Sequence, residues 1–203
     1  MMQNSQTAQQ RPAELFISIL RTKTAPAHQA LEELPISKAI VSPTVSREDY
    51  TAYLNAMADA VHDLETRIFP RVSGLIPDLQ ERRKLPSILE DLAYYGAPKS
   101  HFRPVFTIGE NTSEAFAMGI VYVMEGSVLG GRMILKNLHN ALRMDNESGA
   151  RYFHGYGAET GSRWKSFMEL LARHETAQGC SDDIIRGANH AFAAIHQHFL
   201  QHS

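Results

Sequence analysis

Cysteine is nearly absent from this sequence, and neither sign of charge dominates it. Among the 203 residues there is one cysteine, Cys180, so no disulfide can form within the chain. The 20 basic and 22 acidic residues leave a formal net charge of −2. A chain this close to neutral has no overall field that would attract nucleic acid or an anionic membrane. We therefore expect neither as a partner.

Targeting and membrane-spanning signals are also lacking. The opening residues, MMQNSQTAQQRP, do not contain the apolar core of a secretory signal. The apolar stretch that follows Ala115 is interrupted by Glu125, Arg132 and several glycines. These are too many polar and small groups for a helix that faces lipid, so a buried helix is expected instead. Together with the single cysteine, these absences predict a cytoplasmic protein.

What the sequence does contain is helical periodicity. No segment shows convincing strand alternation, no repeat period is visible, and no low-complexity linker divides the chain. Apolar residues make up 43% and charged residues 21%, which is ordinary for a soluble globular domain. We predict an all-α, single-domain fold of roughly six to eight helices over residues 11–203. A polar, glutamine-rich tail over residues 1–10 is expected to be disordered.

Local signals predict several helix boundaries. One or two short helices are expected over residues 13–34, with Pro26 in a first turn. Ser46 and Asp49 have the spacing of a capping box, and the helix that they open should end at Pro70. Further helices are expected over residues 86–96, 164–175 and 181–200, and from a cap at Asn111 or Thr112 onward.

The stretch YVMEGSVLGGRMIL, residues 122–135, places glycines inside an otherwise good helix. Each mid-helix glycine costs about 1 kcal/mol relative to alanine, so something should approach this backbone closely. At about 100° per residue, one helix face carries Gly119, Tyr122, Gly126, Gly130 and Met133. Two explanations are open. Either a second helix crosses tightly here, or a flat ligand lies against the helix.

A candidate metal ligand lies near the N-terminus. Glu32 follows His28 by one helical turn, so its carboxylate can reach one ring nitrogen and leave the other free for a metal. A histidine on a helix is, however, more often exposed or hydrogen-bonded. Solvent exposure is also expected for the histidines that crowd the last helix, because their spacing does not place three on one face: His190, His196, His198 and His202.

Three other kinds of site find little support. A di-iron carboxylate bundle needs Glu-x-x-His motifs on two helices, and Asp59 with His62 is the nearest approach. The stretch GYGAETG lacks the spacing and the preceding strand of a dinucleotide-binding loop, so it should be a turn between helices. Cys180 has no basic neighbour that would activate it as a nucleophile.

The stretches LRTKTAPAHQALEEL and YVMEGSVLGGRMIL, taken together, resemble the haem oxygenase family. The resemblance is to its bacterial, biliverdin-producing branch, which includes the partners of bacteriophytochromes. It implies that His28 is the proximal ligand of the haem iron and that Glu32 supports this ligand. It also implies that Gly126 and Gly130, with Gly131 after them, form a distal wall without side chains.

The same resemblance implies further roles around the haem. Arg21, seven residues before His28, would meet a propionate, with Lys165 as a weaker candidate, and Tyr122 would form an aromatic edge. Animal-type enzymes have an aspartate directly after the first distal glycine, where this chain has Ser127. The bacterial branch also lacks this acid. Ser127 itself or a residue on another helix would then hold the distal waters.

The implied activity is the opening of haem, as both substrate and cofactor, by dioxygen and external electrons to biliverdin, carbon monoxide and ferrous iron. No flavin or iron–sulfur motif is visible, so an external reductase or ferredoxin-type donor should supply the electrons. A bilin-accepting photoreceptor is a further candidate partner. Two alternatives stay open: a non-catalytic carrier of haem or bilin on the same scaffold, and a helical enzyme of different chemistry, such as thiamin-related hydrolysis.

Overall fold

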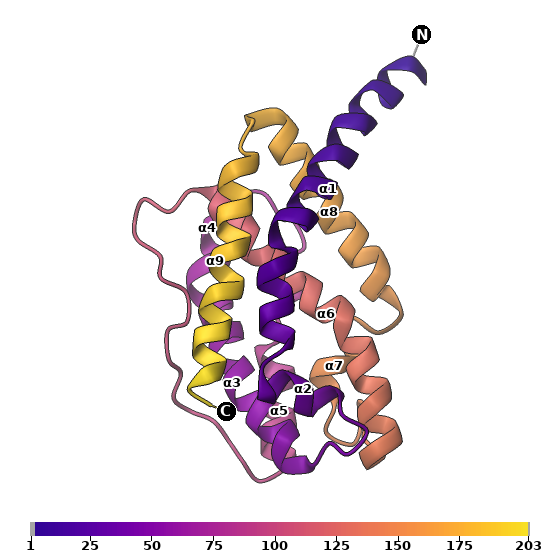
Figure 1. The fold of residues 1–203 in the computed structure, drawn as a ribbon, viewed down its shortest axis with the longest axis vertical. Coiled ribbons are helices and arrows are strands. Elements are labelled where there is room, and N and C mark those ends of the chain that lie inside the picture. Colours follow the sequence, from indigo (N-terminus) through magenta and orange to yellow (C-terminus); the bar gives the residue numbers. More distant parts are fainter. Residues whose placement is uncertain (1–2, 203) are drawn as a thin grey trace.

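The computed structural model describes residues 3–202, with side chains from residue 13 onward. Over these residues the chain folds into helices and loops without a strand, which confirms the all-α prediction (Figure 1). The helices are α1 (Gln3–Glu32), α2 (Pro35–Val41), α3 (Arg47–Asp63), α4 (Phe69–Val72), α5 (Leu85–Tyr94), α6 (Glu114–Leu142), α7 (Arg151–His154), α8 (Thr160–Gln178) and α9 (Ser181–Leu200). Three short segments join them: the π-helical η1 (Leu64–Ile68) and the 3₁₀-helical η2 (Leu79–Arg82) and η3 (Gly157–Glu159).

Helix α1 is one continuous helix, so the prediction that Pro26 begins a short helix is wrong. Proline removes one hydrogen bond from a helix interior and disfavours it. Here Phe16 and Leu20, both buried, anchor the helix before the proline. The Thr24 hydroxyl also donates to the Leu20 carbonyl oxygen at 2.8 Å. Tertiary packing thus overrides the local preference of proline for a first turn.

The N-terminal end of α1 reaches back to Gln3, and in Figure 1 its first turns project beyond the rest of the bundle. No break in the helix marks the expected boundary at residue 11. Residues 1 and 2 lie outside the described residues. Disorder over residues 1–10 and a domain beginning at residue 11 therefore stay predictions.

The capping box at the start of α3 is confirmed. The Ser46 hydroxyl accepts a hydrogen bond from the Asp49 N–H at 3.0 Å, and the Asp49 carboxylate accepts from the Ser46 N–H at 2.8 Å. The predicted end at Pro70 is wrong, because the chain stays helical through η1 and α4 as far as Val72. Proline has no N–H to give to the preceding turn, and the wider π-turn just before it accommodates this loss.

A loop over residues 97–113 connects α5 to α6. The buried carboxylate of Asp63 holds it, accepting hydrogen bonds from the N–H groups of Val105 at 2.8 Å and Phe106 at 2.7 Å. Ser113, and not the predicted Asn111 or Thr112, then caps α6.

Helix α6 runs through the middle of the bundle (Figure 1). It is long and apolar enough to cross a membrane by length and composition alone, but half of its most apolar window is buried inside the protein. Core helices of soluble proteins meet the same criterion. This burial agrees with the expected core helix, whereas a cytoplasmic location stays a prediction.

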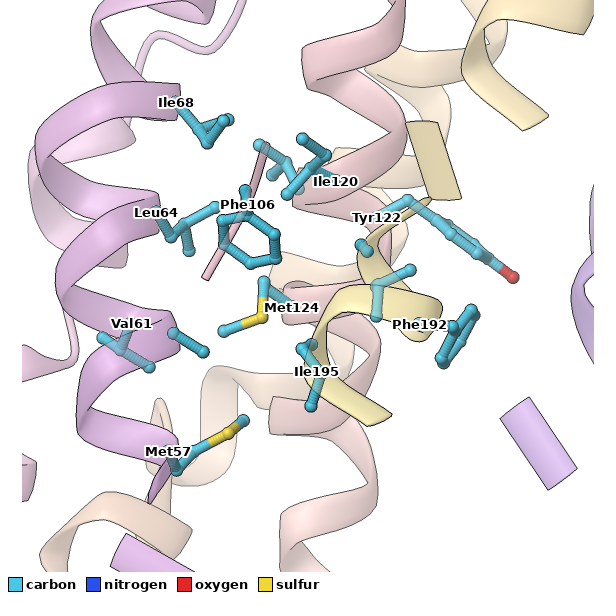
Figure 2. Close-up of a cluster of buried hydrophobic side chains, with 14 of the residues drawn as sticks. Met57, Val61, Leu64, Ile68, Phe106, Ile120, Tyr122, Met124, Phe192 and Ile195 are labelled. Atoms are coloured by element: carbon cyan, nitrogen blue, oxygen red, sulfur yellow. The ribbon is translucent and has the colours of Figure 1, made fainter. Parts of the chain in front are cut away.

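Figure 2 shows the apolar core between α3, α6 and α9. Met57, Val61, Leu64 and Ile68 come from α3 and η1, Phe106 from the loop before α6, Ile120 and Met124 from α6, and Ile195 from α9. Tyr122 points away from α3, toward the opposite side of α6. The two faces of α6 therefore serve different purposes, since one packs the core and the other is left for a second environment.

Helices α6 and α9 cross with their backbones in contact. A Cβ atom added to Gly119 would lie 2.1 Å from the carbonyl oxygen of Ile184, and one added to Gly187 would lie 2.0 Å from that of Phe116. No side chain fits at either position. We call Gly119, Gly126 and Gly130, which share one face of α6, the glycine stripe. The helix-crossing explanation of this stripe is correct for Gly119.

We predict that Gly119→Ala destabilises the protein by roughly 1–3 kcal/mol or more, because its methyl group forces the two backbones apart. Gly130→Ala, in the same helix, is the matched control. Nothing lies within 4 Å of the Cβ that it would add, so this variant should gain up to about 1 kcal/mol in helix propensity. Urea unfolding of both variants checks the prediction, and equal stabilities would contradict it.

Candidate functional site

A cavity of about 660 Å³ lies between α1, α2, α6, α8 and α9. Its volume falls within the range of roughly 300–1,000 Å³ that is usual for ligand pockets. The lining is mostly apolar, and its polar members gather on α1. The lining residues are Arg21, Thr24, Ala25, His28, Leu31, Glu32, Ser37, Ile40, Val41, Tyr53, Met57, Tyr122, Val123, Met124, Gly126, Ser127, Leu129, Gly130, Met133, Ile134, Trp164, Phe192, Ile195 and Phe199.

Bare backbone of α6 forms one wall of this cavity. A Cβ added to Gly130 would meet nothing within 4 Å, and one added to Gly126 would touch only the Trp164 ring, at 3.7 Å. Neither glycine is needed for a helix crossing. Leu129 and Met133 beside them are exposed by 37% and 73%, which leaves apolar surface uncovered along the same wall. These features support the ligand explanation of the glycine stripe for this part of α6.

The polar end of the cavity is formed by α1. His28 Nε2 lies 3.4 Å from Glu32 Oε1, and the two side chains are 55% and 64% exposed. The His28 ring also lies against Phe192 of α9, with 5.4 Å between the ring centroids. Arg21 lines the cavity two turns earlier in α1. A cation, an imidazole and a carboxylate therefore follow one another along a single helix face.

Tyr122 and Ser127 add hydroxyl groups to the wall on α6. Burial raises the pKa of Tyr122, while a hydrogen bond with Thr24 and the Arg21 charge act in the opposite direction. Its ring lies beside Trp164, with 5.7 Å between the ring centroids. The Ser127 hydroxyl donates to the Met124 carbonyl oxygen at 2.7 Å. It also interacts with the Tyr152 hydroxyl.

Two predicted site residues lie outside the cavity. Gly131 is buried on another face of α6, where an added Cβ would lie 3.1 Å from the Phe153 ring. One step along a helix turns a residue by about 100°, which carries Gly131 away from the face of Gly130. The Lys165 side chain is 79% exposed and lies 4.0 Å from Glu169. The structure thus does not bring either residue to the cavity.

A buried ionic network behind the distal wall was missed by sequence reasoning. The side chain of Arg82 is fully buried and donates to Glu125 at 2.6 Å and to both carboxylate oxygens of Asp78, at 2.8 and 2.9 Å. The Tyr156 hydroxyl donates to the other Glu125 oxygen at 2.8 Å. Glu125 directly precedes Gly126, so this network fixes the register of the wall. The one sequence signal for this network was Glu125 itself, an acidic residue within the apolar sequence of α6, which indicates a buried partner of opposite charge.

Charge balance in this network depends on several neighbours. Burial raises the pKa of Glu125, whereas Arg82 and the Tyr156 hydroxyl lower it. The Lys84 ammonium lies over the Tyr156 ring, 3.4 Å from its centroid, and burial lowers the Lys84 pKa to about 8. Arg163 of α8 also contacts Asp78, at 3.0 Å. The network therefore joins α6, α8 and the segment around η2 in one cluster.

The expectations for other sites are mostly confirmed. The stretch GYGAETG forms a connection between α7 and α8. Cys180 is partly buried, and burial raises the pKa of its thiol, which opposes a nucleophilic role. Solvent exposure is wrong for His198, which is only 6% exposed. His190, His196 and His202 are each partly buried. His198 faces Asp59 of α3, a partner on another helix that spacing within α9 alone does not reveal.

The fold and the cavity define a class of protein. A helical bundle encloses an apolar slot with backbone on one wall, a histidine on the other and an arginine on the same helix as the histidine. Such a slot suits a large flat ligand that carries a metal and acidic groups.

Comparison with known proteins agrees with this class. The family model described as Heme oxygenase matches residues 15–201. The chain is 30% identical over 174 residues to "Heme oxygenase PigA" of Pseudomonas aeruginosa, covering 85% of each chain. It is 32% identical over 117 residues to "Heme oxygenase" of Xanthomonas campestris, covering 58% of this chain and 67% of the other. The chain therefore belongs to the heme oxygenase family.

A solved structure supports the fold independently. The heme oxygenase of Neisseria meningitidis, described in its NO- and CO-bound forms, matches with a TM-score of 0.76 and 24% sequence identity. The match covers 92% of this chain and 91% of that one. The arrangement of helices is thus shared far more strongly than the sequence.

We predict that Arg82→Leu destabilises the protein by about 3–5 kcal/mol, because it leaves the buried Glu125 carboxylate without its hydrogen-bonded cation. Arg151→Leu is the matched control. Arg151 forms an ion pair with Glu90, and the two side chains are 52% and 55% exposed, so its loss should cost about 0–1 kcal/mol. Denaturant unfolding at neutral pH measures both, and an equally small effect at Arg82 would contradict the prediction.

Proposed function

We propose that this haem oxygenase binds haem in the cavity between α1 and α6, with His28 as the iron ligand, and opens the ring there. One observation carries the proposal. His28 and the bare backbone of Gly126 and Gly130 line the same cavity, on different helices. A ligand bonded to His28 through a central metal would extend its ring along a wall that has no side chains to obstruct it.

The residues of the cavity fit haem chemically. The apolar lining matches the porphyrin ring, and Arg21 offers a charge partner for a propionate. Glu32 lies close enough to one nitrogen of His28 to orient the imidazole through a hydrogen bond or a bridging water. The other nitrogen then carries the lone pair for iron. Tyr122 adds an aromatic edge.

Bound haem supplies both the redox-active iron and the ring that dioxygen opens, to give biliverdin, carbon monoxide and ferrous iron. The residues of the chain orient the ring, exclude bulk water and hold protons. Gly126 and Gly130 leave room beside the ring, and apolar side chains limit its solvation. Ser127 replaces the acid of the animal-type enzymes. Its hydroxyl, which also interacts with the Tyr152 hydroxyl, is our candidate for holding ordered water near the wall.

Partners outside the chain complete the proposed reaction. The sequence contains no visible flavin or iron–sulfur motif, and an external reductase or ferredoxin-type protein would deliver the electrons. The half-exposed side chains of His28 and Glu32 place one edge of the site at the surface, where such a donor could approach. A bilin-accepting photoreceptor is a proposed recipient of the product.

The principal alternative is a protein that carries haem or bilin without turnover. Aerobic incubation of the protein with haem and a reductant separates the two functions. An oxygenase consumes the Soret band and releases biliverdin and carbon monoxide in equal amounts. Retention of the Soret band with bound haem would instead identify a carrier, and failure to bind haem would contradict both.

We predict that His28→Ala removes the protein ligand to iron while leaving the fold intact, because this side chain is half exposed. The ferric spectrum should change and biliverdin formation should be lost. Glu32→Ala should be milder, with losses of roughly 10- to 100-fold, since Glu32 only supports the ligand. His139→Ala is the control, an exposed histidine of α6 outside this cavity. A wild-type spectrum and turnover in His28→Ala would contradict the assignment.

The distal wall is tested by Gly130→Leu. The side chain should fill space beside the ring, so biliverdin yield should fall strongly while haem still binds through His28. The haem-free protein should be as stable as the wild type or up to about 1 kcal/mol more stable, since leucine is the better helix former. Gly161→Leu, in the first turn of α8, is the control, because nothing lies within 4 Å there either. Normal turnover, or large haem-free destabilisation, would exclude a distal-wall role for Gly130.

A further inference from the structure

A second cluster of metal-binding side chains lies where the end of α9 packs against α3. Asp59 of α3 is fully buried, His198 is 6% exposed, and His202 follows one turn later and is partly buried. One potential ligand atom from each of the three lies within 4.8 Å of the other two. None of these residues lines the haem cavity, although Phe199, the neighbour of His198, does.

Asp59 and His198 bring two buried side-chain atoms close together. His198 Nε2 lies 3.1 Å from Asp59 Oδ2, yet both atoms are buried without a hydrogen-bond partner. The His198 ring does hydrogen-bond to the Ala56 carbonyl. Because Nε2 has no partner, this bond is made by Nδ1, which must carry the proton that a carbonyl accepts. Nε2 of the neutral ring then turns a lone pair toward a carboxylate oxygen.

His202 is oriented in a similar way. Its Nδ1 lies 2.9 Å from the His198 carbonyl oxygen. A carbonyl can only accept, so Nδ1 is the donor and Nε2 holds the lone pair. Histidines that bind metals commonly donate their second nitrogen to a backbone carbonyl in this manner, which fixes the tautomer and the ring orientation.

Asp59 has one satisfied oxygen and one unsatisfied oxygen. Its Oδ1 contacts the Lys99 ammonium at 3.0 Å and accepts from the Arg103 N–H at 3.0 Å. Its Oδ2 faces only the lone pair of His198 Nε2. A buried arrangement of this kind requires a positive centre between the two atoms, either a proton or a metal ion.

We propose that Asp59 Oδ2, His198 Nε2 and His202 Nε2 bind a divalent transition-metal ion of the zinc class. Imidazole and carboxylate ligands lie about 2.0–2.2 Å from zinc, so two ligands of a tetrahedral site are about 3.3–3.5 Å apart. The 3.1 Å between Asp59 and His198 is close to this spacing. The ligand atom of His202 lies within 4.8 Å of the other two, and a water molecule would complete the tetrahedron.

Lys99 bears on the affinity of this site. The positive charge of Lys99 opposes the binding of a second cation. The Lys99 ammonium, however, contacts Asp59 Oδ1, the oxygen that faces away from the proposed ion, and donates to Asn55 Oδ1 at 2.7 Å. The carboxylate thus separates the ammonium from the proposed ion. Such an ion would join the end of α9 to α3, next to the contact between Phe199 and Tyr53, whose ring centroids are 5.4 Å apart. It is independent of haem binding.

The test is titration of the full-length, haem-free protein with Zn²⁺, followed by calorimetry and by thermal unfolding. His202→Gln removes one ligand near the chain end, where the fold should tolerate it. His196→Gln is the matched control, since it removes a histidine of the same helix that lies outside the cluster. Zinc bound elsewhere, for example by His28, affects both variants equally and cancels in the comparison.

We expect wild type and His196→Gln to bind one equivalent of Zn²⁺ that raises the unfolding temperature. In His202→Gln this shift should be lost. The affinity for Zn²⁺ should fall by more than the roughly 10- to 100-fold that is typical when a residue supporting a metal ligand is removed. Nitrogen-15 NMR of the imidazoles gives a second readout, in which one equivalent of Zn²⁺ should shift His198 Nε2. Equal affinities for Zn²⁺ in the two variants would overturn the proposal. So would a His198 ring that is protonated at neutral pH and whose nitrogen signals do not shift when zinc is added, since Asp59 and His198 would then form a simple ion pair.

Discussion

The backbone contact between α6 and α9 is the constraint on which the site depends. At Gly119 and Gly187 the two helices touch without side chains between them, so their separation is fixed at this crossing. Farther along α6, the same face is no longer covered by α9. Gly126 and Gly130 meet either one aromatic ring or nothing, and the space beside them is the cavity. The glycine stripe of α6 therefore has two effects. It allows the close approach of α6 to α9 at Gly119, and it leaves one wall of the cavity without side chains at Gly126 and Gly130.

Local sequence signals predicted the parts of this structure that depend on neighbours in the chain. The capping box of Ser46 and Asp49 needs only three residues, and it formed as expected. His28 and Glu32 need only one helical turn to meet, and they do. The assignment of Gly126 to a cavity required more, because periodicity alone favoured a helix crossing and only the family resemblance favoured the ligand.

Features that depend on distant residues could not be read from the sequence. Gly119 differs from Gly130 only in what packs against it, which is decided by α9 more than fifty residues later. Arg82 and Glu125 lie 43 residues apart, and the pattern of α6 gave only an unexplained acid. His198 looked like one of several solvated histidines until α3 placed Asp59 against it. In each case the deciding partner comes from another helix.

Pro26 has a mechanical consequence for the proposed iron ligand. It lies inside α1 two residues before His28, and without an N–H it cannot bond to the carbonyl oxygen of Thr22. The turn that carries His28 is therefore joined to the rest of the helix by one hydrogen bond fewer, and the bending stiffness of α1 is lowest just before the ligand. Small changes in the distance between imidazole and iron then cost less elastic energy than they would in an uninterrupted helix.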